Sequence, residues 1–328
     1  MNRRSFLCFL ERSAVIAAMA GWLDASSLRV LAAQAESRTV GRATSGQPQV
    51  AITMDDPKVE LSPFMDWQEA NMRILEGLES RKLKAALFVC GKRVDRPGGK
   101  SLLSAWDDAS HLICNHSYSH LMYLRETSYD DFVADFLRGE PIIAPYRNRT
   151  PLFRYPFLKE GDTAEKRDHF REMLKERGYH IGDVTVDGSD WYVDDRMQQR
   201  LQQNPKAKLE PYRDYLIAHL LDRASFYRQL ALDVLGHEVR HTLLVHYTMI
   251  NALFLQDVMA AFEKSGWEWI DADHAYEDPV FLKEPQTLPA GESLIWALAA
   301  ETGKFKDRLR YPGEDDTYEK PKMDALGL

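Results

Sequence analysis

Cysteine is scarce in this chain of 328 residues, which contains only Cys8, Cys90 and Cys114. Three cysteines cannot form a disulfide framework. Long apolar runs are also missing, because no window reaches the roughly 20 uninterrupted apolar residues of a membrane-spanning helix. Basic residues are outnumbered, with 42 Lys and Arg against 50 Asp and Glu, and the net charge is −8. We therefore expect neither a membrane span nor a nucleic-acid-binding surface.

The remaining composition is that of a globular protein. Hydrophobic residues make up 45% of the chain and charged residues 28%, which excludes a disordered or collagen-like chain. The length is sufficient for one large domain or two small ones.

The first 35 residues resemble an export signal. Arg3-Arg4 followed by Phe6-Leu7 is similar to a twin-arginine motif. A moderately apolar stretch covers residues 13–23, and Ala33-Gln34-Ala35 offers an A-x-A cleavage site. We expect residues 1–35 to direct the protein to the periplasm or the cell exterior. The alternative is an amphipathic first helix of the mature fold. Residues 36–48 are small and polar, which is typical of a linker.

A repeating pattern of short apolar runs and helical segments begins near residue 49. The helical segments are expected at 66–82, at 163–177 after an Asp162/Glu165 capping box, and at 251–265. The apolar runs predict strands at 49–54, 84–90, 110–115, 151–155, 180–187, 242–247 and 267–270. This alternation favours a parallel α/β fold, either a barrel or an open doubly wound sheet.

The pattern also predicts the domain organisation. One domain covers residues 49–279, and residues 194–241 are expected to form a helical insertion of two helices, interrupted near Asn204-Pro205. Residues 280–328 are expected to hold one helix, over 291–302, and otherwise to form a surface tail.

Polar side chains gather where four of the predicted strands end. In both parallel architectures the chemistry lies at the carboxyl ends of the strands, so these clusters are candidate functional residues. They are Asp55-Asp56 after the first strand, His116 and His120 after the third, Asp187, Asp190 and Trp191 after the fifth, and His246 at the end of the sixth.

Two of these clusters suggest a metal site. Two histidines four residues apart can face one direction on a helix or in a tight turn, and a carboxylate from another strand would complete an Asp/His/His set. Such a set suits Zn²⁺ and similar ions and leaves a position for water. Taken singly, the aspartate pair is also typical of a helix cap, the histidine pair of a solvated surface and His246 of a buried core histidine. Their order and their placement at strand ends favour the site.

Five short motifs in this order resemble the polysaccharide deacetylases of the NodB-homology type, carbohydrate esterase family 4, over about residues 49–275. They are Thr53-Met54-Asp55-Asp56-Pro57, His116-Ser117-Tyr118-Ser119-His120, Arg154-Tyr155-Pro156-Phe157, Asp187-Gly188-Ser189-Asp190-Trp191 and Leu244-Val245-His246. The resemblance implies a distorted (β/α)7–8 barrel and a metal-dependent hydrolase that removes acetyl groups from N-acetylated, or O-acetylated, carbohydrate.

The resemblance also implies a role for each matching residue. Asp56, His116 and His120 would hold the metal, which would be Zn²⁺, or alternatively Co²⁺ or Ni²⁺. Asp55 would be the general base, paired with Arg154, and His246 the general acid, oriented by Asp190. The backbone N–H of Phe157 would help to bind the oxyanion, and Trp191 and Leu244 would wall a pocket for the acetyl methyl group.

Two residues depart from the family pattern. Pro57 and Leu158 stand where the family usually has glycine. Both lie at turns near the site, so loop shape and substrate access are expected to differ. The substrate therefore stays open among chitin oligomers, peptidoglycan, acetylated xylan and small ureides or amides. The 194–241 insertion is expected to border the mouth of the site.

Two competing functions remain. His237-Glu238-Val239-Arg240-His241 spells the H-E-x-x-H signature of zinc proteases, although an apolar strand-like run follows at once and Gly236 weakens the preceding helix. A non-catalytic carbohydrate-binding barrel is the other alternative, but binding alone needs neither a base nor an acid.

Other residues are expected to be structural. Cys90 and Cys114 end neighbouring strands, where a disulfide is geometrically awkward, and we expect two buried thiols. Aromatic residues near strand ends can stack on sugar rings but more often serve packing; here they are Trp67, Tyr118, Tyr192 and Trp267.

Overall fold

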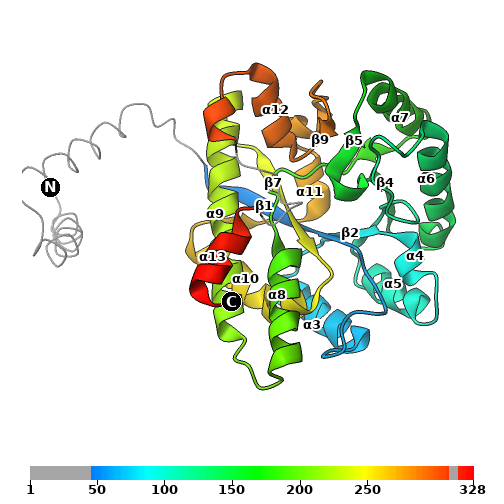
Figure 1. Ribbon diagram of the computed structural model, residues 1–328. Helices are drawn as coiled ribbons and strands as arrows, with labels where there is room; N and C mark the ends of the chain where they lie inside the picture. The colour runs from blue at the N-terminus through cyan, green and yellow to red at the C-terminus, as the bar shows by residue number, and fades with distance from the viewer. Residues whose placement is uncertain (1–45, 310–316) are drawn as a thin grey trace, which may run out of the picture. The chain divides into compact units, whose positions relative to one another are not determined.

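A curved parallel sheet forms the centre of the computed structural model, which describes residues 46–309 and 317–328 (Figure 1). The strand order is β6-β4-β3-β2-β1-β7, and β8 pairs with the first residues of β1. The predicted export signal and most of the predicted linker lie outside the described residues. The strands are β1 (Gln49–Asp55), β2 (Ala86–Val89), β3 (Leu112–Asn115), β4 (Arg149–Phe153), β6 (His180–Ile181), β7 (Arg240–His246) and β8 (Glu268–Trp269).

The segment 180–187 closes this sheet into a distorted barrel. At its start β6 pairs with β4, and the Gly182 N–H donates to Phe153 O at 2.7 Å. Four residues later the segment has moved to β7, where the Val186 N–H donates to Thr242 O at 2.9 Å and the Leu244 N–H donates to Val186 O at 3.0 Å. The predicted strand is therefore real but irregular, and the predicted barrel class is confirmed.

Helices cover the outside of the barrel, as the alternating pattern predicts (Figure 1). The helix expected at 66–82 is α3, that at 163–177 is α7 and that at 251–265 is α10. The cap of α7 differs from the prediction, because the Thr163 side chain accepts the Lys166 N–H. The helices up to the insertion are α3 (Trp67–Glu79), α4 (Gly91–Val94), α5 (Gly99–Asp108), α6 (Tyr129–Ile143) and α7 (Ala164–Glu176).

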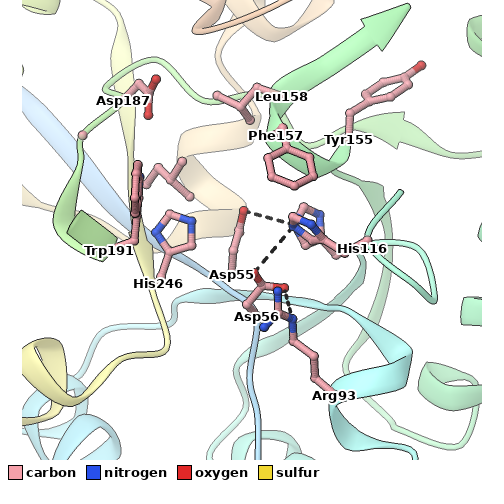
Figure 2. Close-up of a pocket in the computed structure, with 13 residues that line it drawn as sticks. Asp55, Asp56, Arg93, His116, Tyr155, Phe157, Leu158, Asp187, Trp191 and His246 are labelled. Carbon is pink, nitrogen blue, oxygen red and sulfur yellow. Dashed lines mark ion pairs between the residues drawn. The ribbon is translucent and has the colours of Figure 1, made fainter. Parts of the chain in front are cut away.

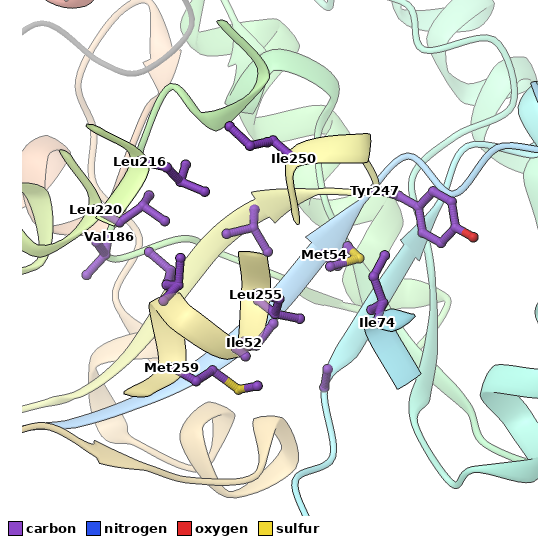
Figure 3. Close-up of a cluster of buried hydrophobic side chains, with 14 of the residues drawn as sticks. Ile52, Met54, Ile74, Val186, Leu216, Leu220, Tyr247, Ile250, Leu255 and Met259 are labelled. Atoms are coloured by element: carbon purple, nitrogen blue, oxygen red, sulfur yellow. The ribbon is translucent and has the colours of Figure 1, made fainter. Parts of the chain in front are cut away.

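Side chains of β1 alternate between two environments. Val50, Ile52 and Met54 point outward into the main apolar core, which also contains residues of α3, α9 and α10 (Figure 3). Each such burial contributes about 1.5–3 kcal/mol. Ala51 belongs instead to a second buried cluster that includes Phe88 and Leu152. Because successive residues of a strand face opposite sides, Thr53 and Asp55 share the inner face with Ala51.

The insertion consists of two helices, α8 (Asp190–Gln203) and α9 (Glu210–Leu235), with the predicted interruption at Asn204. Helix α9 ends at Gly236, which is left-handed with φ 79°, and β7 begins at Arg240. The H-E-x-x-H sequence is therefore not on a helix: His237 is exposed in a turn, whereas His241 is buried on β7. This arrangement contradicts the zinc-protease alternative, which needs both histidines on one helix face.

The helix expected over 291–302 is present as α12 (Leu294–Thr302), which buries Leu294 and Ile295. It follows α10 (Met249–Lys264) and α11 (Ala272–Tyr276). The rest of the described C-terminal part is more buried than the predicted surface tail, because Met323 is fully buried. A two-stranded antiparallel sheet joins β5 (Lys159–Gly161) to β9 (Ala290–Gly291).

Helix α13 (Glu319–Leu326) is anchored by a buried charged cluster. Glu319, which is 1% exposed, accepts from the Arg223 guanidinium at 3.0 Å and from the Ser189 hydroxyl at 3.1 Å. The Ser189 N–H donates in turn to His219 Nε2 at 2.9 Å. Two segments 130 residues apart in sequence are thereby joined.

Two smaller predictions are confirmed. Cys90 and Cys114 are buried and unbonded. None of the described helices is long and apolar enough to cross a membrane.

Candidate active site

The predicted polar residues meet in one cavity of about 260 Å³ at the carboxyl ends of the strands (Figure 2). Register and side-chain alternation explain the convergence. Asp55 and His246 are directly paired as the last residues of β1 and β7. His116 follows β3, and its backbone N–H donates to Val89 O at the end of β2.

Asp56, His116 and His120 form a candidate metal site. One ligand atom from each of the three lies within 4.8 Å of the others. The His116 Nδ1–H donates to the Arg154 carbonyl at 2.8 Å, which leaves Nε2 without a proton and turned toward the carboxylates. Burial lowers the pKa of His116 and of His120 to about 4. Both rings are therefore neutral near pH 7 and fit a divalent metal as nitrogen donors.

The loop that carries the two histidines is a tight turn with a strained backbone. Ser117 and His120 have φ values of 63° and 61°. Helix α6 holds the loop, because the Asp135 carboxylate accepts the Tyr118 and Ser119 N–H groups. Left-handed backbone costs a non-glycine residue about 1–2 kcal/mol. The same conformation recurs around the cavity at Asp56, Phe157 and Leu158, with φ values of 64°, 57° and 55°, a clustering typical of functional sites.

Arg154 holds Asp55, as the resemblance predicts. Its Nη1 lies 2.5 Å from Asp55 Oδ1. The other guanidinium donors reach Gly182 O, the Thr53 hydroxyl and the Tyr276 hydroxyl at 2.8–3.0 Å. Burial raises the pKa of Asp55, and the Arg154 charge opposes that rise without cancelling it. A carboxylate with a raised pKa is a stronger proton acceptor.

Asp190 holds His246 on the opposite side of the cavity. Its Oδ1 lies 2.8 Å from His246 Nδ1, and Oδ2 accepts the His246 N–H at 2.7 Å. The Asn251 amide donates to the same Oδ2 at 2.6 Å. With Nδ1–H bound to Asp190, Nε2 is the atom that faces the cavity (Figure 2). Burial works against the charged imidazole, but Asp190, with Asp55 and Asp56, raises the pKa of His246 to about 9.

The cavity has an apolar side as well as a charged one. Phe157, Leu158, Trp191 and Leu244 supply its apolar lining, and Figure 2 shows Phe157 and Leu158 across the cavity from Arg93. The Phe157 N–H has no hydrogen-bond partner within the described residues, whereas the next N–H, that of Leu158, donates to Tyr155 O. The predicted oxyanion donor is therefore available.

The aromatic residues considered for sugar stacking lie elsewhere. The cavity is lined by none of these four residues, which are Trp67, Tyr118, Tyr192 and Trp267, and the last three are buried. They therefore contribute to packing rather than to sugar stacking at this site.

Sequence reasoning missed three contacts of this site. Arg93 of α4 places Nε 2.9 Å from Asp56 Oδ1 and lines the cavity. Tyr276 of α11 and Asn251 of α10 hold Arg154 and Asp190. Arg93 follows a strand end, the one sequence signal that could have indicated it. The other two come from helices and carry no such signal.

Comparison with known proteins gives one match to a family model. Residues 42–182 match the sequence profile of the family described as Polysaccharide deacetylase. No curated protein sequence matches the chain significantly.

Several solved structures are similar to this chain at low identity. Peptidoglycan deacetylase PdaC from Bacillus subtilis is 20% identical, over 71% of this chain and 91% of that one, with a TM-score of 0.47. The chitin deacetylase from Colletotrichum lindemuthianum is 18% identical over 70% and 88%, with a TM-score of 0.48. A CE4 family pseudoenzyme from Bacillus anthracis is 18% identical over 70% and 66%, with a TM-score of 0.47.

Fold and site together define an α/β barrel with a candidate Asp/His/His metal site at its strand ends. Residues 42–182 are similar to the polysaccharide deacetylase family, the same family that the motifs resemble. The motifs around Asp190 and His246 lie beyond that match, and the structure brings them to the same cavity.

Proposed function

We propose that this protein is a metal-dependent hydrolase that removes acetyl groups from N-acetylated, or O-acetylated, carbohydrate. The observation that carries the proposal is the placement of Asp55 and His246 on paired strand ends beside the Asp56, His116 and His120 cluster. A carbohydrate-binding protein would need neither a proton acceptor nor a proton donor at these positions.

Each residue has a distinct part in the proposed reaction. A divalent metal, Zn²⁺ being the best fit to one carboxylate and two imidazoles, supplies a Lewis acid that lowers the pKa of water and polarises a carbonyl. Asp55 accepts the proton of the attacking water, and Arg154 keeps its carboxylate in place. The free Phe157 N–H is available to stabilise the oxyanion that develops on the carbonyl oxygen.

Departure of the sugar amine or alcohol needs a proton from the other side of the cavity. His246 is protonated near pH 7 and held by Asp190, so its Nε2–H is a suitable general acid. Trp191 and Leu244 offer an apolar surface for the acetyl methyl group.

The N-terminal sequence supports export of this enzyme. The paired Arg3-Arg4, the apolar stretch and the A-x-A site at residues 33–35 favour a twin-arginine-like signal and a periplasmic or extracellular location. Cell fractionation followed by N-terminal sequencing tests this: a mature chain beginning near residue 36 outside the cytoplasm is expected.

Acetate release tests the catalytic proposal. The purified protein, supplied with Zn²⁺, is incubated with N-acetylglucosamine oligomers, acetylated xylan and peptidoglycan, beside Asp55→Asn. Loss of the base is expected to lower kcat by about 10²–10⁴-fold. The control Asp108→Asn alters an exposed surface carboxylate and should not lower it. Metal binding without acetate release from any of these substrates would overturn the proposal.

A further inference from the structure

Leu158 occupies an unusual backbone position at the edge of the cavity. It stands where the family pattern has glycine, yet it adopts a left-handed conformation with φ 55°, which L-residues avoid. The position is held on both sides, because its N–H donates to Tyr155 O and its carbonyl accepts the Glu292 N–H at 2.9 Å.

The C-terminal strand β9 secures this conformation. Gly291 passes so close that a Cβ there would lie 1.7 Å from Leu158 O. Glu292 also forms an ion pair with Lys159, the residue after Leu158. These contacts come from outside the region that matches the family profile, so holding Leu158 in place is a feature of this chain's C-terminal segment.

The side chain of Leu158 is directed to the apolar side of the cavity. It forms a small buried cluster with Val184 and Leu244 and is 7% exposed. Leu244 lies two residues before His246 on the inner face of β7, and Leu158, Leu244 and His246 line the same cavity. A glycine at position 158 would leave the space of an isobutyl group open beside Leu244.

We propose that Leu158 sets the depth of the acyl pocket and restricts the enzyme to acetyl and smaller acyl groups. This inference rests on the proposed deacetylase function, in which the acyl group lies against Trp191 and Leu244. A longer acyl chain would collide with the Leu158 side chain, which its anchored backbone cannot move aside.

The test compares acyl lengths on one sugar. The kcat/KM values are measured for N-acetyl- and N-butyryl-glucosamine oligomers of equal length, with wild type, Leu158→Gly and Leu158→Ala. One methylene in an apolar pocket changes kcat/KM by about 10–200-fold. We expect the butyryl-to-acetyl ratio to rise at least about 10-fold in Leu158→Gly and to rise in Leu158→Ala as well. A bulkier Leu158→Phe variant should lose acetyl activity.

Leu201→Ala is the matched control, because Leu201 is also a buried leucine, at 6% exposed, but does not line the cavity. Its ratio should equal that of wild type. An unchanged ratio in both Leu158 variants, or an equal rise in Leu201→Ala, would overturn the inference. Failure of the wild type to release any acyl group would instead count against the proposed function itself.

Discussion

Asp190 contacts His246 twice, through the imidazole Nδ1 at 2.8 Å and through the backbone N–H at 2.7 Å. One carboxylate therefore fixes the ring orientation, its tautomer and the end of β7. Asp190 is itself completely buried and held by the Asn251 amide, so it has little freedom to release the histidine.

The pH dependence of His246 should follow from this contact. Against the effect of burial, Asp190 raises the pKa of His246 to about 9. Because the pKa of His246 is higher in the folded protein than its unfolded value near 6.5, protonated His246 stabilises the fold. This contribution is complete below pH 6.5 and is lost as the pH rises through about 9. In Asp190→Asn the pKa should fall, and the alkaline limb of kcat should move to lower pH. Histidine ¹⁵N NMR of the metal-free protein measures the pKa of His246 in wild type and in Asp190→Asn. An unchanged pKa in the variant would contradict this prediction.

Removal of Arg154 should damage both stability and catalysis. Deleting one partner of a buried ion pair costs about 3–5 kcal/mol, so Arg154→Met is expected to lower the free energy of unfolding by that amount. The pKa of Asp55, already raised by burial, should rise further and shift the acid limb of activity to higher pH. Urea denaturation gives the stability. The double variant Asp55→Asn/Arg154→Met should be less destabilised than the sum of the single variants, and simple additivity would argue against the pair.

Metal binding should depend on the histidine loop. His116→Ala is expected to abolish both metal retention and acetate release, because the remaining Asp56 and His120 offer too few ligands. His237→Ala removes an exposed histidine of the H-E-x-x-H sequence. Because His237 is not part of the three-ligand site, this variant should still bind about one metal ion per chain. Elemental analysis after dialysis measures both, and a fully loaded His116→Ala protein would show that the site is assigned wrongly.

Arg93 is expected to tune the metal site through Asp56. Its Nε lies beside Oδ1, while Oδ2 faces His120, so the arginine orients the carboxylate toward the candidate metal position. Loss of such an outer contact typically lowers metal affinity about 10–100-fold. Arg93→Ala should therefore bind Zn²⁺ more weakly in a chelator competition. If Arg93 acted only as a repelling positive charge, its removal would strengthen binding.

Arg96→Ala provides the matched control for this measurement. Arg96 lies three residues further along the chain and pairs with the exposed Glu60, and the side chains of Arg93 and Arg96 are both 35% exposed. Its removal should leave the zinc affinity unchanged.

Much of the fold was predictable because β1 and β7 are short apolar runs that end in polar residues. Alternation of Val50, Ile52 and Met54 with smaller residues indicates a strand with one face on the helices, and the polar residues at its end mark the site. The motifs then assign Asp55, Arg154 and His246 to one site, and in the structure Arg154 contacts Asp55, which is paired with His246 across the strand ends.

Other features depend on contacts that no local pattern reveals. Glu319 reads as a solvated charge in sequence, and it is buried only because Arg223 meets it from a helix 96 residues earlier. The tail was therefore misjudged. Similarly, no local pattern around Leu158 indicates that Gly291 and Glu292, more than 130 residues later, hold its backbone in the left-handed conformation.

The closure of the barrel by residues 180–187 and β7 has a consequence for protein engineering. All seven residues of β1 pair with β7, which lies beyond the region matched by the family profile. A fragment cut at residue 182 would expose that strand edge, and unpaired edges template association with other chains. The region that matches the family profile, residues 42–182, therefore lacks a strand that completes the sheet. We expect a fragment of that length to aggregate.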